Sequence, residues 1–371
     1  MSYRNLISLL TAFFIFFSTA AVAQVDGEPF IVQGAKVHKV PSNIVPNQIY
    51  EVRVAVPGSY ASSPDKSYPI VVVLDGQWNF TIVSDIVGKL SYDGMMPEAI
   101  TVGITWGGEG DDPNQLRSRD FIRPSFPSMP MSGGAQSFLA ALTEELIPFV
   151  ENQYRVADKK VLMGSSLGGL FTSYAMLEKP GFFDGYVAIA GSYSVDSAYF
   201  DEKLAYYAHT RALKDVRSYL AVGSLDGNEV LVKTLNNSIK AAHLKEFKNK
   251  HKVFKDVGHA GVEPLAYTYG LQYVFERPFL KLSEQFLQRY AGEYEGGFVE
   301  GQPLFPVTVS VSGKGLLTIS DGQQTFQLQA ASETEFYWNG VNVSARFTGP
   351  DKFVFNSQGT IFYFQRVASQ P

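Results

Sequence analysis

The sequence predicts an α/β protein with a doubly wound, mostly parallel sheet, followed by a small antiparallel β-barrel or sandwich. Between about residues 27 and 280, apolar strand-like runs alternate with helical patterns, which is typical of a sheet covered by helices on both faces. From Ala291 onward the helical period disappears, and short alternating runs follow one another at intervals of roughly 8 to 12 residues. That spacing is typical of a small barrel or sandwich.

The strands expected in the first region are short and rich in Val, Ile and Leu. Near-continuous apolar runs fit strands that are buried on both faces, as in a parallel sheet. An earlier segment, residues 48–60, alternates between apolar and polar residues and is expected to be an antiparallel strand. The apolar runs are residues 68–76, 99–106, 159–165, 185–192, 217–224 and 251–257.

Two segments between these runs have the periodicity of amphipathic helices. Residues 133–154 place Leu139, Leu142 and Leu146 on one stripe, and residues 228–246 repeat the pattern. In the C-terminal region the alternating runs are 307–313, 316–322, 325–330, 335–340, 341–349, 352–359 and 361–367.

The first 23 residues have the pattern of a secretory signal peptide. Arg4 is a positive flank, Leu6 to Phe17 is an uncharged apolar run, and Ala21-Val22-Ala23 is a cleavage signal. The run is too short for a stable membrane anchor. We therefore expect a signal peptide over 1–23, a catalytic domain over 24–287 and an all-β domain over 288–371, in a protein that is exported to the periplasm or secreted.

Composition excludes several classes of partner and site. The chain has no cysteine, so it can have neither a lipid-modified cysteine nor a disulfide. The formal charge of −5 becomes −6 when Arg4 is removed, and no basic stripe is present. Nothing therefore favours nucleic acid or an anionic membrane as a partner. No metal-ligand spacing and no cofactor motif is present either.

The segment "VLMGSSLGGLFTSYAM" (161–176) predicts a reactive serine. It matches G-x-S-x-G as Gly164-Ser165-Ser166-Leu167-Gly168, which makes Ser166 the candidate nucleophile. A frame centred on Ser165 would need glycine where Met163 and Leu167 stand. The preceding strand-like run and the following helical run supply the strand–turn–helix context that this motif requires.

A serine nucleophile needs a base that is oriented by an acid, and in this arrangement the acid and then the histidine follow the serine along the chain. His259 lies in a glycine-flanked loop after the last expected strand, where an imidazole can reach over the sheet. Asp226 follows the strand at 217–224 and is the favoured acid. Glu229, which could instead cap the next helix, is the alternative acid, and Asp256 ranks third.

The oxyanion hole is expected from the N–H groups of Leu167 and Gln77, because Gly76 permits a close turn before Gln77. Trp78 either lines the pocket or covers the core. In "RSRDFIRP", Arg119 either braces a loop by pairing with Asp120 or holds an anionic or polyhydroxylated substrate.

Residues ~45–280 resemble the esterase D family of α/β-hydrolases, and most of all its ferric-siderophore (enterobactin) esterase-like branch. The resemblance rests on the segments "YPIVVVLDGQWNF", "MPEAITVGITW", "RSRDFIRP", "LTEELIPFVENQYR", "LMGSSLGGLFTSYAML" and "GHAGVEPLAYTYGLQYVF". It implies Ser166 as nucleophile, His259 as base and the Gln77 and Leu167 amides as oxyanion donors. The segment after ~288 resembles the small lipocalin-like β-domains that are appended to other serine hydrolases.

The leading hypothesis is therefore an exported serine carboxylic-ester hydrolase that acts on a small-molecule ester, of siderophore or acyl-sugar type, without a cofactor. An acyltransferase of the same fold and a non-catalytic binding protein are the alternatives. The sequence leaves the substrate, the role of the β-domain and the oligomeric state open.

Overall fold

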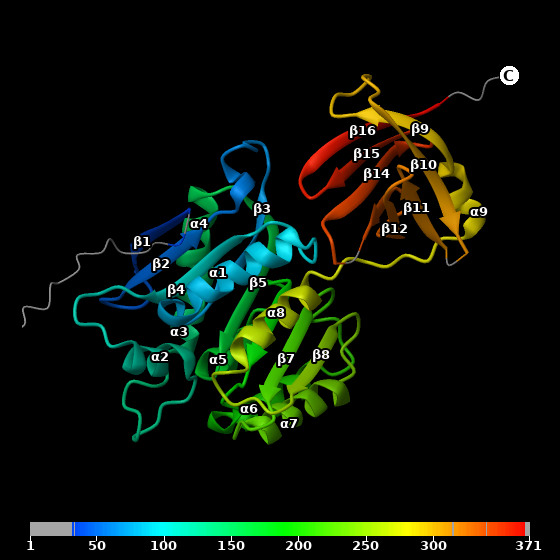
Figure 1. Cartoon of the computed structure of the whole chain (residues 1–371). Helices are drawn as coiled ribbons and strands as arrows, with labels where there is room; N and C mark the ends of the chain where they lie inside the picture. The colour runs from blue at the N-terminus through cyan, green and yellow to red at the C-terminus, as the bar shows by residue number, and fades with distance from the viewer. Residues whose placement is uncertain (1–31, 33, 314, 339, 368–371) are drawn as a thin grey trace, which may run out of the picture. The chain divides into compact units, whose positions relative to one another are not determined.

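The computed structural model describes residues 32, 34–313, 315–338 and 340–367. The expected signal peptide, residues 1–23, lies outside the described residues. The first part of the described chain contains an eight-stranded sheet in the order β1-β2-β4-β3-β5-β6-β7-β8 (Figure 1). Its strands are β1 (Ala35–Pro41), β2 (Ile49–Ala55), β3 (Tyr68–Val73), β4 (Ile100–Trp106), β5 (Val156–Ser165), β6 (Gly185–Ile189), β7 (Arg217–Gly223) and β8 (Lys248–Phe254).

The sheet is mostly parallel, because only β1 and β2 run against their neighbours. Every residue of β4 and of β6 is buried, as the continuous apolar runs predict for strands covered on both faces. The expected fold class is confirmed. The segment predicted as an early antiparallel strand is β2, which pairs with β4.

The helices of this part are α1 (Gly76–Tyr92), α2 (Pro113–Phe121), α3 (Ala135–Ala141), α4 (Ile147–Gln153), α5 (Leu167–Glu178), α6 (Ser197–Tyr207), α7 (Glu229–Ala241) and α8 (Glu263–Val274). The chain steps from β3 to β4 in one direction along the sheet and from β5 to β6 in the other. Because such crossovers are right-handed, α1 and α5 cover opposite faces. Helix α8 packs beside α1, and α5 packs beside α2 and α6.

The segment predicted as one helix over 133–154 differs in detail. It forms α3 and α4 with a π-helical turn, Leu142–Leu146, between them. Pro148 lies at the start of α4, and a proline has no N–H to donate to the carbonyl four residues earlier and would clash with it. The wider turn removes that clash, so the periodicity continues although the hydrogen-bond pattern changes.

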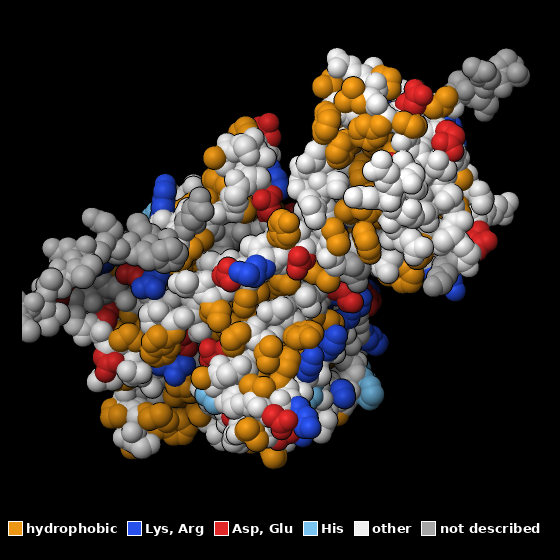
Figure 2. Space-filling view, viewed as in Figure 1, with side chains coloured by type: hydrophobic (Ala, Val, Ile, Leu, Met, Phe, Trp, Pro, Cys, Tyr) orange, Lys and Arg blue, Asp and Glu red, His pale blue; other side chains and the backbone are white. Residues whose placement is uncertain are grey.

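The C-terminal part is a closed antiparallel barrel in the order β10-β11-β12-β13-β14-β15-β16-β9, which confirms the expected small β-structure. Its core is filled by aromatic and aliphatic side chains such as Tyr294, Phe347 and Phe353. Figure 2 shows mainly hydrophobic and uncharged side chains on the visible surface of this barrel, with few charged ones. The strands are β9 (Gly292–Gly297), β10 (Phe305–Ser312), β11 (Leu316–Ser320), β12 (Thr325–Ala330), β13 (Glu335–Tyr337), β14 (Val343–Gly349), β15 (Lys352–Ser357) and β16 (Thr360–Arg366).

The buried hydrophobic residues form two clusters, one between Val40 and Phe275 and the other between Leu287 and Phe364. The short helix α9 (Glu284–Leu287) contributes Leu287 to the second cluster. The domain boundary at 287/288 stays a prediction. Within the described residues, no helix is both long enough and apolar enough to cross a membrane.

Candidate active site

Ser166 lies at a sharp bend between β5 and α5, with φ 58° and ψ −118°. A non-glycine residue with positive φ is uncommon and is often found at a functional site. The bend depends on close backbone packing, since a Cβ added to Gly164 would lie 2.4 Å from the Gly168 carbonyl oxygen. A Cβ on Gly169 would lie 2.6 Å from the Ile189 carbonyl oxygen. Only glycine fits at these two positions.

The two neighbouring serines have different environments. Ser165 ends β5 and is buried, and its hydroxyl has no hydrogen-bond partner among the described residues. The Ser166 hydroxyl lies 3.4 Å from the Ser192 hydroxyl, which follows β6. The Ser192 N–H also donates to the Ser166 carbonyl oxygen at 3.2 Å. Ser166 is therefore the serine at the bend, and its neighbour is part of the strand.

Asp226 and His259 form a direct pair. Asp226 follows β7 and His259 follows β8, and Asp226 Oδ2 lies 2.8 Å from His259 Nδ1. The other carboxylate oxygen accepts a hydrogen bond from the Asn228 N–H at 2.8 Å. The Asp226 side chain is 3% exposed and the His259 side chain 45%. A neutral imidazole that donates from Nδ1 to this carboxylate keeps a free lone pair on Nε2.

The third contact of a triad is not formed in this structure. Within the described part of the chain, the Ser166 hydroxyl is hydrogen-bonded to Ser192 and not to the His259 ring. Such bonds are often long or misaligned without substrate.

The other acids considered in the sequence have different partners. Glu229 begins α7 and forms an ion pair with Lys233 one turn later. Asp256 is exposed and lies 3.7 Å from the Lys255 ammonium group. Neither carboxylate is hydrogen-bonded to His259 in the described residues.

The two expected oxyanion donors lie at the start of helices that follow adjacent strands. Leu167 is the first residue of α5, after β5, and Gln77 is the second residue of α1, after β3. Strands β3 and β5 pair in parallel, so both helix starts lie at the same edge of the sheet. The first N–H groups of a helix have no partner within the helix and favour an anion.

Asp75 holds the turn before Gln77 by a buried ion pair that the sequence did not reveal. Asp75 has φ 53° and accepts hydrogen bonds from Arg117, at 3.1 Å from Nε and 2.8 Å from Nη2. Burial raises the pKa of the Asp75 carboxyl, and Arg117 acts in the opposite direction. A Cβ on Gly76 would lie 2.9 Å from the Gly103 backbone, so this glycine lets the turn pack against β4.

The two predicted substrate-binding side chains have distinct surroundings. Trp78 is 55% exposed and lies under the Arg117 guanidinium, 5.5 Å from the ring centre. Arg119 donates to Asp120 at 2.7 and 2.9 Å and to Gln48 at 2.8 Å. The buried Asp120 carboxylate also accepts from Tyr50 and Trp106. The loop expected here is wrong, because Arg119 and Asp120 lie in α2, and Arg119 joins this helix to Gln48 just before β2. The role of Arg119 toward a substrate stays a prediction.

Two residues near this site had no signal in the sequence. Asn228 donates from its amide to the Ala190 carbonyl oxygen at 2.9 Å, while its N–H holds Asp226. Ser192 lies on the loop after Ala190 and contacts Ser166. A polar residue after a strand is common in loops, so neither position stands out without coordinates.

Comparisons with known proteins show similarity to esterases. A family model described as "Putative esterase" matches residues 42–259, more than half of the chain. The ferri-bacillibactin esterase BesA of Bacillus subtilis (strain 168) is 31% identical over 182 residues, which cover 45% of this chain and 60% of BesA. The siderophore enterobactin esterase of Emericella nidulans is 30% identical over 162 residues, which cover 38% of this chain and 53% of that enzyme.

A solved structure has a similar fold. The BES protein from Bacillus cereus superposes with a TM-score of 0.60 at 24% identity, covering 67% of this chain and 98% of that protein. The chain belongs to the esterase family that the model describes, and its first part has an α/β-hydrolase fold. The resemblance to siderophore esterase-like proteins is confirmed, although the chain matches only 60% and 53% of the length of the two named relatives.

Proposed function

We propose that this protein is a serine carboxylic-ester hydrolase in which Ser166 is the nucleophile, His259 the base and Asp226 the acid that orients the base. One observation carries the proposal: the serine stands on a left-handed bend at the start of a helix, and a carboxylate–imidazole pair with a 2.8 Å separation follows later strands of the same sheet. The order of these residues along the chain is that of other hydrolases of this fold.

The chemistry follows from the contacts. The Ser166 hydroxyl turns from Ser192 toward His259, gives its proton to Nε2 and attacks the carbonyl carbon of the ester. The N–H groups of Leu167 and Gln77 stabilise the oxyanion of the tetrahedral intermediate. The imidazolium then protonates the departing alcohol oxygen, which leaves an acyl group on Ser166. A water molecule, deprotonated by His259, releases the acid and restores the serine.

Two neighbouring serines provide a sharp test. We expect Ser166→Ala to lower the rate of p-nitrophenyl acetate hydrolysis by at least about 10⁴-fold, because the members of a triad act as a unit. Ser165→Ala is the matched control and should stay within about threefold of the parent, since that hydroxyl is buried and has no partner among the described residues. A fluorophosphonate probe should label the parent and the control, but not Ser166→Ala. Equal hydrolysis by all three proteins would refute the proposal.

For the substrate we propose siderophore-type esters. The support is the named activity of the two relatives, ferri-bacillibactin esterase and enterobactin esterase. A panel of siderophore lactones, acetylated sugars and aryl esters tests this choice by kcat/KM. A clear preference for acetylated sugars or simple aryl esters over the lactones would contradict it while leaving the esterase chemistry intact.

We also propose that the protein is exported after cleavage following Ala23. The support is the charged, apolar and small-residue pattern of residues 1–23. Expression of the full chain followed by cell fractionation and N-terminal sequencing tests it. The mature protein should begin at Gln24 in the periplasmic or extracellular fraction, and an uncleaved chain in the cytoplasm would contradict export.

A further inference from the structure

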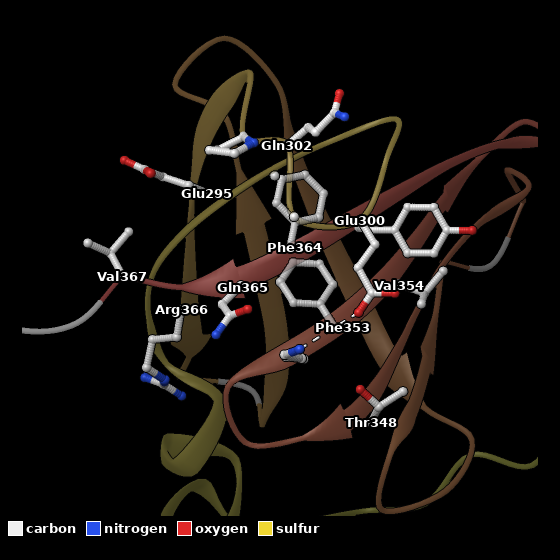
Figure 3. A pocket seen from close by; sticks show the side chains of 15 residues that line it. Glu295, Glu300, Gln302, Thr348, Phe353, Val354, Phe364, Gln365, Arg366 and Val367 are labelled. Carbon is white, nitrogen blue, oxygen red and sulfur yellow. Dashed lines mark ion pairs between the residues drawn. The ribbon is translucent and has the colours of Figure 1, made fainter.

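The C-terminal barrel carries a cavity that the proposed esterase chemistry does not use. It has a volume of about 310 Å³, at the lower end of the range for small-molecule pockets. Figure 3 shows it between the chain that follows β9 and the strands β14, β15 and β16. The residues that line it are Glu295, Gly296, Glu300, Gly301, Gln302, Pro303, Thr348, Lys352, Phe353, Val354, Tyr363, Phe364, Gln365, Arg366 and Val367.

Strand register places a row of polar side chains along this cavity. Gln365 on β16 pairs with Lys352 on β15 and with Glu295 on β9. Directly paired residues on neighbouring strands point to the same face of a sheet. An ammonium group, a carboxamide and a carboxylate therefore stand side by side across three strands.

An aromatic residue lies two positions earlier on the same face. Tyr363 on β16 pairs with Val354 on β15 and with Gly297 on β9. Gly297 has no side chain, and the Gln302 carbonyl oxygen and the Leu304 side chain of the following loop occupy the space beside it. Tyr363 and Val354 both line the cavity and give it an apolar part beside the polar row.

The loop between β9 and β10 forms the opposite wall. The Leu304 N–H donates to the Gly296 carbonyl oxygen at 2.8 Å, and Glu300 lies 3.7 Å from the Lys352 ammonium group. A Cβ on Gly297 would lie 2.7 Å from the Gln302 carbonyl oxygen, so the loop approaches the strand closely. The cavity is thus held by backbone contacts and by an ion pair that crosses it.

The charges of the lining disfavour an anionic ligand. Lys352 pairs with Glu300, and the Arg366 guanidinium is engaged by Asp351 and by backbone carbonyls, so the Glu295 carboxylate is left over. A small negative net charge gives an anion no attraction. The barrel interior does not offer an apolar alternative, because its core is filled by packed rings such as Phe353 and Phe364.

The polar groups of the lining are free to bind. Among the described residues, no protein hydrogen bond uses the side chains of Gln302, Tyr363 or Gln365. Carboxamide and phenol groups donate and accept hydrogen bonds, so they match the hydroxyl groups of a sugar. The faces of sugar rings carry C–H groups that pack on an aromatic ring, which Tyr363 supplies.

We propose that this cavity binds a neutral saccharide, one or two sugar rings in size, through the Lys352–Gln365–Glu295 row and the Tyr363 ring. The site does not depend on Ser166, so it gives the barrel a binding function of its own beside ester hydrolysis.

Titration calorimetry on the mature full chain tests the proposal. The probes are cellobiose, maltose and N,N′-diacetylchitobiose as neutral saccharides, with glucose 6-phosphate as a charged probe and laurate as an apolar one. We expect at least one neutral saccharide to bind. We expect Gln365→Ala to weaken that binding about fivefold and Tyr363→Ala about tenfold, from the loss of hydrogen bonds and of ring contact.

Gln323→Ala is the matched control, because Gln323 is an exposed amide in a turn of the same barrel, outside the cavity. It should leave saccharide binding unchanged, and so should Ser166→Ala. Circular dichroism reports whether the barrel variants are folded; if Tyr363→Ala is not, Lys352→Ala takes its place. The proposal is overturned if no neutral saccharide binds, if both cavity variants bind like the control, or if glucose 6-phosphate or laurate binds at these residues instead. None of these results would affect the esterase proposal.

Discussion

Breaking the ion pair between Asp75 and Arg117 should strongly destabilise the α/β part, because it leaves a charge buried without a partner. Asp75 is 2% exposed, and both of its carboxylate oxygens accept hydrogen bonds from Arg117. Arg117→Ala would leave this carboxylate buried without its cation. Breaking a buried pair costs about 3–5 kcal/mol, and we expect about 3 kcal/mol at pH 7, because Arg117 itself is 17% exposed and water can partly replace it.

The stability lost in Arg117→Ala should be smaller at low pH than at neutral pH. Burial already raises the pKa of the Asp75 carboxyl, and Arg117 lowers it, so removing Arg117 raises the pKa further. A carboxyl with a folded-state pKa above its unfolded value favours folding at low pH and loses that contribution as pH rises through the folded pKa. The variant should therefore be closer to the parent in stability at pH 5 than at pH 7.

Urea denaturation at both pH values measures these differences. Arg123→Ala is the matched control, because Arg123 makes a similar two-bond pair with Asp196 but is 42% exposed, and exposed pairs contribute about 0–1 kcal/mol. Adding Asp75→Asn to Arg117→Ala should recover about 1–2 kcal/mol, since a neutral amide costs less to bury than a charge. A loss in Arg117→Ala no greater than in Arg123→Ala, or one that does not shrink on acidification, would refute this reasoning.

Two further substitutions test the geometry of the site. Asp226→Asn should lower kcat roughly 10³–10⁴-fold by disturbing the tautomer of His259, with little change in the urea midpoint. The control Glu229→Gln should keep a kcat within about threefold of the parent. Equal losses of kcat in the two variants would exclude Asp226 as the unique acid. Gly164→Ala should destabilise the protein by at least about 2 kcal/mol, because its Cβ would meet a backbone carbonyl oxygen at 2.4 Å. Gly58→Ala, where a Cβ meets nothing within 4 Å, is its control in the same denaturation experiment, and similar stability of the two variants would contradict the packing argument.

The sequence predicts those features that depend on local pattern. The continuous apolar runs predict strands buried on both faces, and the glycines around Ser166 predict the bend, since a Cβ does not fit at Gly164 or Gly169. The π-helical turn could not be predicted in this way, because a wider turn hardly changes the apolar stripe of residues 133–154. The Asp75–Arg117 pair joins residues that are 42 positions apart, and no periodicity reports on such a contact.

Sequence position did not distinguish Asp226 from Glu229, but their hydrogen-bond partners in the structure differ. Both carboxylates follow β7 within a few residues, and sequence position alone left them as alternatives. In the structure the turn brings the Asn228 N–H to Asp226 Oδ1 and leaves Oδ2 for His259, whereas Glu229 lies in the first turn of α7 and pairs with Lys233. These contacts support Asp226 as the proposed acid.

Asn228 also links this turn to Ser166. Its amide holds the Ala190 carbonyl oxygen after β6, and the loop that follows carries Ser192, whose N–H and hydroxyl both contact Ser166. The ends of β5, β6 and β7 are therefore joined through Asn228 and Ser192. The position of Ser166 in the structure depends on this link as well as on its own bend, and the spacing of the glycines alone does not predict the link.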